Sequence, residues 1–428
     1  MKTIKRSDFT APWMLVWIAL AVRVLYMTFA HTWRFSPIED HFNFGHEMGR
    51  IARAVATGYG YADPFNGHTG PTAWLPPVYP LLIAACFKLF GVYSNGAGWV
   101  LLALNSVFSA LTIRPLWEIA QRSFHRSVAT WSAWIWALYP AFLQYAVKWV
   151  WETTLTTWLF TFALVLALRM RGIGEDRHES PTVGEWLGFG LVWAGIALTN
   201  PSPLLFLPVA GVWIILGCPL RDWQSQAGKA VLAAVLFIAC VAPWTYRNYR
   251  ALHAFVPLRA NFGAELYLGN GPGSNGLEMG WQHPYMAPDQ REIYRRMGEV
   301  AYSKMRGDAA KAYIKQDPLH FLHNCLLRTF YFWAGVPRTS VRGFWKQYGP
   351  DLNFDLITIV GLLGLLLTLT RRIPAAGLYA LAFALLPLTY YAVTVSARFR
   401  HPLEPLIVIF TVYLFQSAEK RWTIWPWR

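Results

Sequence analysis

The chain has 428 residues, of which 55% are hydrophobic, 16% are aromatic and only 14% are charged. Soluble domains carry about 25% charged residues, so this composition excludes an ordinary soluble domain and is typical of a polytopic membrane protein. The formal net charge of +15 does not indicate nucleic-acid binding, because no basic stripe lies on a soluble segment.

Apolar segments recur along the whole chain, and most are long enough to cross a hydrocarbon core about 30 Å thick. They predict an all-α membrane fold with about ten transmembrane helices, in a range of roughly nine to thirteen. The first segment lacks a cleavage site, so we interpret it as a retained signal anchor. The predicted spans are Ala11–Ala30, Trp99–Trp117, Val128–Ala146, Thr153–Met170, Gly184–Thr199, Pro203–Gly217, Ala230–Tyr246, Leu356–Thr370, Ala375–Val393 and Pro402–Phe415.

Basic residues in the short connections predict the orientation, because lysine and arginine are retained on the cytoplasmic side. If each span crosses once, all these residues share the side of the N-terminus, so both termini are expected in the cytoplasm. A crossing at His320–Trp333 would place Arg371 and Arg372 outside, so we predict an interfacial or partly embedded helix there. The basic residues are Arg122, Arg126, Arg169, Arg171, Arg177, Arg221, Lys229, Arg371, Arg372, Lys420 and Arg421.

This map divides the chain into three parts. Residues 1–246 form an N-terminal transmembrane module that contains a first outer loop at 32–98. Residues 247–351 form a second outer region, periplasmic or interfacial, and 352–428 supply the C-terminal transmembrane helices. Long connections of this kind are usually functional, so the active site is expected in the two outer regions.

The first outer loop opens with the polar stretch IEDHFNFGHEM, Ile38–Met48. Asp40 to Val55 predicts an amphipathic juxtamembrane helix, on which Asp40 and Glu47 share a face at about 100° per residue. His41 and His46 diverge on that helix, whereas zinc ligands converge, so a metal site is not indicated. The four scattered cysteines add no zinc or disulfide pattern. A plain interfacial helix with an acidic edge is the alternative.

Two helices and a glycine-rich loop are predicted further along the outer regions. Pro76–Pro77 begins a helix at Val78–Phe90 that is too short to cross, with Trp74 at the membrane interface. In the second outer region, the GNGPGSNG stretch is a flexible polar loop. Tyr, Trp and Asn side chains near it suit a sugar, although a plain surface loop is an equal alternative. Asp289–Lys315 is expected to be a charged helix that covers the region.

Charged residues also gather at the outer mouths of two spans. Glu152 begins the fourth span, where an acid is a functional candidate by default. A helical Lys148–Glu152 pair is the structural alternative. Arg398 and Arg400 lie before the last span, on the side where positive charge is unusual. A guanidinium group binds phosphate oxygens bidentately, so they suit a phosphate at the membrane surface, with lipid headgroups as the alternative.

Three stretches together resemble a known family. Asp40 is followed by Asp63–Pro64, then by WLPPVYPLLIAACFKLFG (Trp74–Gly91) and, near the C-terminus, by RFRHPLEPLIVI (Arg398–Ile409). This arrangement resembles the GT-C glycosyltransferases, specifically the bacterial relatives of protein O-mannosyltransferases and lipid A aminoarabinose transferases in glycosyltransferase family 39. The resemblance implies a GT-C fold.

The resemblance also implies an activity. A sugar would move with inversion from an undecaprenyl-type phosphate to a hydroxyl of a lipid, glycan or protein acceptor. The expected location is the bacterial inner membrane, with the active site facing the periplasm. No cofactor is expected, and a divalent cation is not supported, because the family's D-E-x-x-Y pattern reads DHFNF here.

Two other functions were weighed, a flippase or transporter of lipid-linked sugar and a polymerase or ligase of surface polysaccharide. A carrier would place ionisable groups at mid-membrane in repeated halves, whereas the charges here gather at outer mouths. By the resemblance, Asp40 and Glu152 are the candidate catalytic residues. The candidates for binding the donor lipid phosphate are Arg398, Arg400, Lys148 and Arg247. The candidates for contact with substrate or acceptor are Glu39, Glu47, Trp74, His68, Asn261, Glu265 and Asn270.

Overall fold

The protein is described by a computed structural model that covers residues 11–175, 179–336 and 344–418. These residues fold into helices joined by loops, and they contain no β-strand beyond one isolated bridge between Ala62 and Pro71. The predicted all-α class is therefore confirmed for the described chain. Of the basic residues used to predict orientation, Arg177, Lys420 and Arg421 lie outside the described residues.

The helices fall into two groups. The apolar bundle comprises α1 (Pro12–Phe29), α4 (Asn95–Leu111), α5 (Ile113–Ser123), α6 (Arg126–Leu138), α7 (Pro140–Val147), α8 (Thr153–Met170), α9 (Val183–Thr199), η3 (Ser202–Phe206), α10 (Leu207–Ile215), η4 (Leu220–Asp222), α11 (Trp223–Leu252), α16 (Phe344–Thr370), α17 (Ala376–Leu385), α18 (Leu388–Ala392), η6 (Ala397–Leu403) and α19 (Glu404–Ser417). The outer group comprises η2 (Phe42–Phe44), α2 (Glu47–Ala56), α3 (Val78–Phe90), α12 (Phe262–Asn270), η5 (Gly280–Gln282), α13 (Pro288–Met297), α14 (Glu299–Gln316) and α15 (Pro318–Ala334).

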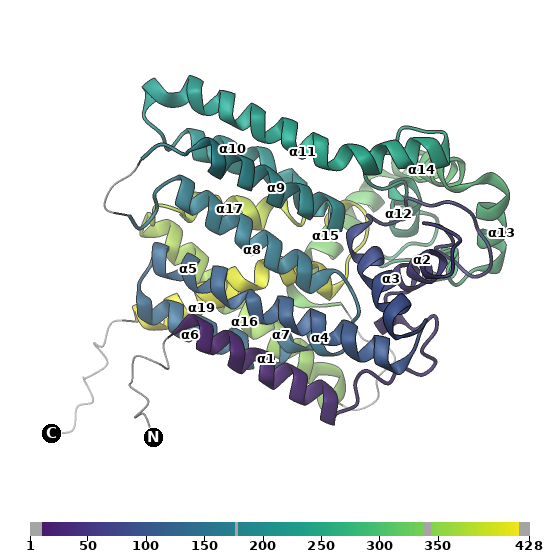
Figure 1. Ribbon diagram of the computed structural model, residues 1–428, viewed down its shortest axis with the longest axis horizontal. Helices are drawn as coiled ribbons and strands as arrows, with labels where there is room; N and C mark the ends of the chain where they lie inside the picture. The colour runs from purple at the N-terminus through teal and green to yellow at the C-terminus, as the bar shows by residue number, and fades with distance from the viewer. Residues whose placement is uncertain (1–10, 176–178, 337–343, 419–428) are drawn as a thin grey trace.

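The long apolar helices lie side by side, and α2, α3, α12, α13 and α14 gather at one end of them (Figure 1). Among the described residues, four helical segments are long and apolar enough to cross a membrane: Pro12–Phe29, Asn95–Ser123, Thr153–Met170 and Leu220–Leu252. Shorter apolar helices lie at Val78–Phe90, Val183–Thr199, Ser202–Ile215, Phe354–Thr370 and Ala376–Ala392. These apolar helices support a membrane protein, and the predicted number of about ten spans stays a prediction.

Each predicted span falls on helical residues, but several spans are interrupted. The segment predicted as Val128–Ala146 is two helices, α6 and α7, that meet at Tyr139 because Pro140 begins α7. The segment Ala375–Val393 is likewise divided at Pro387, between α17 and α18. Proline has no amide hydrogen to continue the helical ladder, so each break leaves backbone carbonyl groups that need another donor.

Arg23 supplies that donor at the break between α6 and α7. It lies within α1 and is completely buried. Its guanidinium donates to the carbonyl of Ala137 at 3.0 Å and to that of Trp136 at 2.9 Å. It also donates from Nε to the Ser109 hydroxyl at 3.0 Å, which joins α4 to the same point. A buried cation is costly unless its donors are satisfied, and here every nitrogen has a partner.

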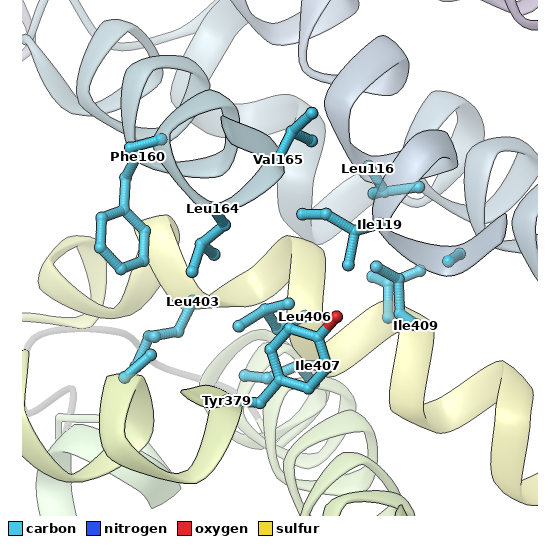
Figure 2. Close-up of a cluster of buried hydrophobic side chains, with 14 of the residues drawn as sticks. Leu116, Ile119, Phe160, Leu164, Val165, Tyr379, Leu403, Leu406, Ile407 and Ile409 are labelled. Carbon is cyan, nitrogen blue, oxygen red and sulfur yellow. The ribbon is translucent and has the colours of Figure 1, made fainter. Parts of the chain in front are cut away.

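The centre of the bundle is the C-terminal helix α19, whose residues from Glu404 to Tyr413 are all buried. Figure 2 shows Leu406, Ile407 and Ile409 of α19 packed among side chains of α5, α8 and α17. On another side α16 contacts α19 closely through Gly364, where a Cβ atom would lie 2.1 Å from the Phe410 carbonyl oxygen. Small residues allow such close helix approach in membrane proteins.

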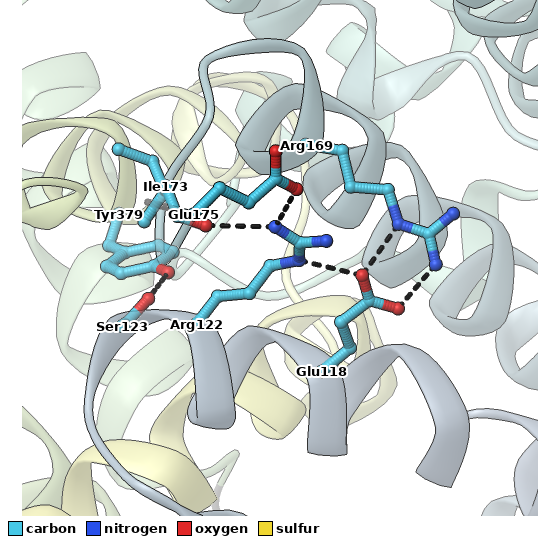
Figure 3. A network of polar contacts seen from close by, with 7 residues as sticks. All are labelled: Glu118, Arg122, Ser123, Arg169, Ile173, Glu175 and Tyr379. Atoms are coloured by element: carbon cyan, nitrogen blue, oxygen red, sulfur yellow. Dashed lines mark hydrogen bonds and ion pairs between the residues drawn. The ribbon is translucent and has the colours of Figure 1, made fainter. Parts of the chain in front are cut away.

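At the opposite end of the bundle from the outer helices, ion pairs join α5 to α8 (Figure 3). Glu118 accepts from Arg122 at 2.7 Å and from Arg169 at 2.6 Å. Arg122 also donates to Glu175 at 2.7 Å. Ser123 and Tyr379 are hydrogen-bonded at 2.5 Å, which links α5 to α17. Two of the basic residues that predict the orientation are thus tied into a structural network at one end of the bundle.

The first outer loop corrects the prediction of one helix from Asp40 to Val55, because α2 begins only at Glu47. The preceding residues form the short turn η2, and Gly45 has a φ of 82°. A Cβ atom on Gly45 would lie 2.7 Å from the Val150 carbonyl oxygen. The Val150 amide in turn donates to the Asn43 carbonyl at 2.7 Å. Tertiary pairing with the segment before α8 therefore replaces the first two helical turns.

The predicted single helix Asp289–Lys315 is also two helices, α13 and α14, because Gly298 adopts a φ of 79°. The first residue of α14, Glu299, is buried and joins the two outer regions. Its carboxylate accepts from the Thr72 hydroxyl, from the Ala73 amide at 2.6 Å and from the Tyr294 hydroxyl at 2.7 Å. The helix is therefore part of the fold and not only a charged cover.

We predict that Arg23→Leu lowers the free energy of unfolding by about 2–3 kcal/mol, because it leaves two buried carbonyls and a hydroxyl without donors. Thermal and denaturant unfolding in detergent measure the change. Arg250→Leu, which removes an exposed arginine at the end of α11, is the control and should change stability by less than about 0.5 kcal/mol. Equal stability of the two variants would contradict the role given to Arg23.

Candidate active site

A cavity of about 680 Å³ lies where the two outer regions meet the bundle. Its walls come from distant parts of the sequence: η2 and α2, the segment before α8, the turn after α9, α12 with its flanking loops, and the chain around η6. The polar and charged residues that line it are His46, Glu47, Glu152, Asn200, Ser202, Arg259, Asn261, Glu265, Glu278, His283, Thr389, Tyr390, Thr394 and Arg398.

Arg398 is the central cation of this cavity. Its guanidinium carbon lies 3.5 Å from the centre of the Trp151 ring and 5.7 Å from that of Phe42. Its Nε and Nη1 atoms are buried, and neither has a hydrogen-bond partner. The aromatic rings stabilise the cation and hold it in place, but they accept no conventional hydrogen bond. Buried donors without a partner are rare in native structures, and a guanidinium with free donors beside a cavity can bind an anion there.

Three of the four glutamates that line the cavity are Glu47, Glu265 and Glu278. Burial raises the pKa of the Glu47 carboxyl to about 8, and the nearby Glu265 and Glu278 add to the increase. Burial also raises the pKa of Glu278 to about 7, again with a contribution from Glu265, and it raises the pKa of Glu265 itself. Like charges in a desolvated site disfavour ionisation, so Glu47 and Glu278 can exchange protons near neutral pH.

Two histidines stand beside Glu47 in a neutral form. His283 Nε2 lies 3.5 Å from Glu47 Oε1, and burial lowers the pKa of this histidine to about 3. Burial, together with the positive charge of Arg398, lowers the pKa of His46 to about 4. The His46 ring stacks on Tyr285 with their centres 3.8 Å apart. A neutral imidazole can either donate or accept a hydrogen bond, so both rings can orient a substrate hydroxyl.

Glu152 lies at the other wall of the cavity, directly before α8. One carboxylate oxygen accepts from the Asn200 side chain at 3.2 Å. The other is buried and has no hydrogen-bond partner. The predicted Lys148–Glu152 helical pair is not formed, because α7 ends at Val147 and residues 148–152 are not helical. Glu152 thus presents an unused acceptor to the cavity.

Arg328 of α15 holds one wall of the cavity in position, and it is completely buried. It donates to the carbonyls of Tyr391 and Ala392 at the end of α18, both at 3.1 Å. It also bonds to the Asn270 side chain at 2.9 Å and to the Gly276 carbonyl at 3.0 Å. One side chain therefore joins the ends of α12 and α18, from which Glu265 and Thr394 reach the cavity.

The cavity brings together six of the residues predicted from the sequence. They are Glu47, Trp74, Glu152, Asn261, Glu265 and Arg398. The structure joins them from five separate stretches of the chain, two of which lie in predicted loops. The sequence reasoning missed Arg259, Glu278, His283 and the role of His46.

Asp40, the predicted catalytic acid, does not line the cavity. Its carboxylate is paired with Arg50, and its carbonyl accepts from the Tyr285 hydroxyl. Its neighbour Glu39 is exposed. The argument that Asp40 and Glu47 share a helix face is wrong, because Asp40 precedes the helix and has a φ of 57°. The structure links Asp40 to the cavity only indirectly, through Tyr285 and the stacked His46.

The other predicted donor ligands do not reach the cavity either. Arg400 is fully buried in the bundle, where it bonds to the Trp333 carbonyl at 3.2 Å and lies 3.5 Å from Glu404. Arg400 lies two residues after Arg398 on η6, and its side chain is buried in the bundle instead of lining the cavity. Lys148 is exposed outside the cavity. Arg247 bonds to the carbonyls of Tyr61 and Thr72, so it ties α11 to the first outer loop.

Two predicted acceptor contacts have structural partners elsewhere. His68 lies 3.0 Å from Asp63 on the exposed side of the first outer loop. Asn270 is buried and donates to the Ala392 carbonyl at 2.9 Å. Within the part of the chain that the structure describes, no three His, Cys, Asp or Glu side chains converge as metal ligands would.

Comparison with known proteins supports the resemblance found in the sequence. Residues 75–246 match the family described as dolichyl-phosphate-mannose-protein mannosyltransferase. The fold is similar to the archaeal oligosaccharyltransferase AglB from Archaeoglobus fulgidus, solved with an inhibitory peptide and a dolichol-phosphate, with a TM-score of 0.51 and 14% identity. The match covers 93% of this chain and 50% of AglB, so this chain spans about half the length of that enzyme.

A second similar structure is ArnT from Cupriavidus metallidurans bound to undecaprenyl phosphate, with a TM-score of 0.42 and 15% identity. That match covers 92% of this chain and 77% of ArnT. No curated protein matches the sequence. The likeness to AglB agrees with the predicted fold, and the family match covers residues 75–246, which is less than half of the chain.

We predict that Glu47→Gln becomes more stable relative to the native protein as pH rises. The native carboxyl has a folded pKa of about 8, well above the ordinary value of about 4.3. The folded state therefore binds more protons between these values, and native stability falls across that range. Urea unfolding between pH 5 and 8.5 should show that the difference in free energy of unfolding between Glu47→Gln and the native protein grows by a few kcal/mol at most.

Glu292→Gln is the control for that comparison. Hydrogen bonds from Arg295 and Arg296 lower the pKa of this exposed glutamate to about 2. Its contribution to stability is therefore complete above its ordinary pKa, and its loss should give a constant difference from pH 5 upward. A gap for Glu47→Gln that is also constant with pH would show that Glu47 is not held in its protonated form.

Proposed function

We propose that this chain, whose residues 75–246 match the dolichyl-phosphate-mannose-protein mannosyltransferase family, is a membrane glycosyltransferase that takes its sugar from a polyprenyl-phosphate donor. The acceptor is a hydroxyl group at the outer face of the bacterial inner membrane. The single observation that carries the proposal is Arg398, a half-buried cation with two buried, unpartnered nitrogen atoms in a cavity lined by carboxyl groups.

Arg398 supplies the anion-binding half of the site. The bond that breaks joins the anomeric carbon of the sugar to a phosphate oxygen, and negative charge develops on the leaving lipid phosphate. A fixed guanidinium in a desolvated site stabilises that charge without reorganisation, which is where electrostatic catalysis is strongest. Trp151 and Phe42 keep the guanidinium from turning away. The apolar residues Leu204, Leu205 and Pro208 in the same cavity suit the first units of the lipid chain.

Glu47 supplies the proton-accepting half. The acceptor hydroxyl loses its proton to this carboxylate as its oxygen forms the new bond to the anomeric carbon. A base works best when its pKa is close to the working pH, which the buried position of Glu47 provides. The base and the phosphate lie on opposite faces of the reacting carbon in a single displacement, so the sugar is transferred with inversion.

Asp40 acts indirectly, through residues that it holds in position. Its carboxylate fixes Arg50 of α2, and its carbonyl fixes the Tyr285 hydroxyl. Tyr285 in turn stacks on His46 at the cavity wall. We therefore treat Asp40 as a positioning residue for α2 and His46, whereas the family resemblance makes it the base. Glu152 is assigned to a hydroxyl of the donor sugar through its free carboxylate oxygen.

We predict that Arg398→Ala weakens the affinity for undecaprenyl phosphate about 10- to 100-fold, because a charged hydrogen bond contributes about 1.5–3 kcal/mol. Arg398→Lys should give an intermediate loss, because it keeps the charge but not the bidentate fork. Ligand-induced thermal stabilisation and direct binding measure both, and Arg250→Ala controls for the loss of an exposed positive charge. Native affinity in Arg398→Ala would remove the basis for the proposal.

The roles of Glu47 and Asp40 are separated by Glu47→Gln and Asp40→Asn. We predict that Glu47→Gln lowers the rate of sugar transfer about 10²–10⁴-fold while donor binding is retained. Asp40→Asn should lower the transfer rate by a smaller factor. The remaining rate of this variant should still increase with pH up to about 8, as the rate of the native protein does. Single-turnover transfer from a radiolabelled polyprenyl-phosphate sugar measures both. The reverse order of effects would assign the base to Asp40, as the resemblance implies.

A further inference from the structure

A second cavity, of about 410 Å³, opens on the surface of the second outer region. It lies between the glycine-rich loop that follows α12 and the corner where α14 meets α15. Among the described residues, it shares no lining residue with the cavity around Arg398. The residues that line it are Asn270, Gly271, Pro272, Gly273, Tyr313, Ile314, Gln316, Asp317, His320, Phe321 and Asn324.

The lining combines two aromatic rings with short polar side chains. Tyr313 is 41% exposed and Phe321 is half-buried, so both have ring surface to offer. Gln316 and His320 lie on the same rim and are exposed. A pyranose ring has an apolar C–H face and a rim of hydroxyl groups. Aromatic rings pack against the C–H face of the sugar, and amide and imidazole groups form hydrogen bonds with its hydroxyl groups.

Asn324 provides an acceptor at the base of this cavity. The residue is completely buried, and its Nδ2 donates to the Ser274 hydroxyl at 2.9 Å. Its Oδ1 has no hydrogen-bond partner. A buried polar atom without a partner is costly, and a hydroxyl group of a ligand is a donor that would satisfy it. The same amide nitrogen is also 3.2 Å from His320 Nε2.

The charges of the cavity argue against a phosphate. No lysine or arginine lines it, and the one carboxylate in the lining, Asp317, caps the start of α15 by accepting from the His320 amide at 2.9 Å. That carboxylate would repel an anion. A neutral ligand therefore fits better than a phosphate or a sulfated group, and the donor phosphate belongs at Arg398 instead.

The position of the cavity connects it with the candidate active site. Helix α12 carries Glu265 in the first cavity and Asn270 in the second, five residues further along. At about 1.5 Å per residue, the two positions are separated by roughly 7.5 Å along the helix axis. This distance is similar to the length of one or two sugar units.

We propose that the second cavity binds a neutral pyranose ring of a glycan-bearing acceptor, a short distance from the hydroxyl that reacts in the first cavity. The inference rests on the proposed function for the identity of the reacting end, but the binding of the sugar itself is independent of transfer. It gives the glycine-rich loop a function that the sequence only suggested. It also names a carbohydrate, not a peptide, as the part of the acceptor that the protein recognises.

Saturation-transfer difference NMR of the full chain in lipid nanodiscs tests the proposal. The probes are methyl β-D-glucopyranoside, methyl β-D-galactopyranoside and maltotriose. The native protein should give ring-proton signals with at least one of them. Tyr313→Ala and Gln316→Ala should each raise the dissociation constant about tenfold. Both replace exposed side chains, and a thermal unfolding curve confirms that each variant is folded.

Tyr249→Ala, which removes a 56% exposed tyrosine of α11, is the matched control and should bind as the native protein does. Excess undecaprenyl phosphate should leave the sugar signal in place. Absence of signal in the native protein, native affinity in Tyr313→Ala, or displacement by undecaprenyl phosphate would each overturn the proposal. Donor binding at Arg398 is measured separately, so the absence of sugar binding in the second cavity would not contradict the proposed transferase. Sugar binding can also be measured in a protein that transfers no sugar.

Discussion

Buried arginine side chains make the broken helices of this membrane protein possible, and the cavity depends on those breaks. Arg23, Arg328 and Arg400 are all completely buried, and each donates to backbone carbonyls at or near the end of a helix. In an apolar bundle a free carbonyl has no water to bond, so a helix can stop only where another donor replaces its ladder. The ends of α12 and α18, held by Arg328, are also where the chain turns into the cavity.

Arg398 carries the same guanidinium group, but its hydrogen-bond donors are arranged differently from those of Arg23 and Arg328. It lies two residues before Arg400, but its guanidinium packs on Trp151 and leaves two nitrogen atoms without partners. Arg23 and Arg328 thus use their donors within the fold, whereas Arg398 presents free donors to the cavity. The acids follow the same division. Glu299 is buried with three donors, whereas the Glu47 carboxyl lines the cavity with His283 Nε2 3.5 Å away.

Much of the fold was predictable because hydropathy is a local property. The spans, the helix at Val78–Phe90 and the all-α class follow from runs of apolar residues and from the proline that begins a helix. The errors have tertiary causes. The helix expected from Asp40 stops short because Gly45 packs against the backbone at Val150. The break at Gly298 depends on a positive φ, which a charged helical pattern does not reveal.

The sequence by itself determined that this is a helical membrane protein, and it singled out Arg398 and Glu152 as charges where a lipid bilayer disfavours them. Which charges face one another was decided only by the tertiary structure. Arg398 and Arg400 look equivalent in the sequence, yet one lines the cavity and the other is paired in the core. Glu278 and His283 lie in loops without periodicity, and only chain packing brings them to Glu47. Local patterns fix the direction of a side chain on its own helix, whereas burial and pairing depend on residues more than a hundred positions away.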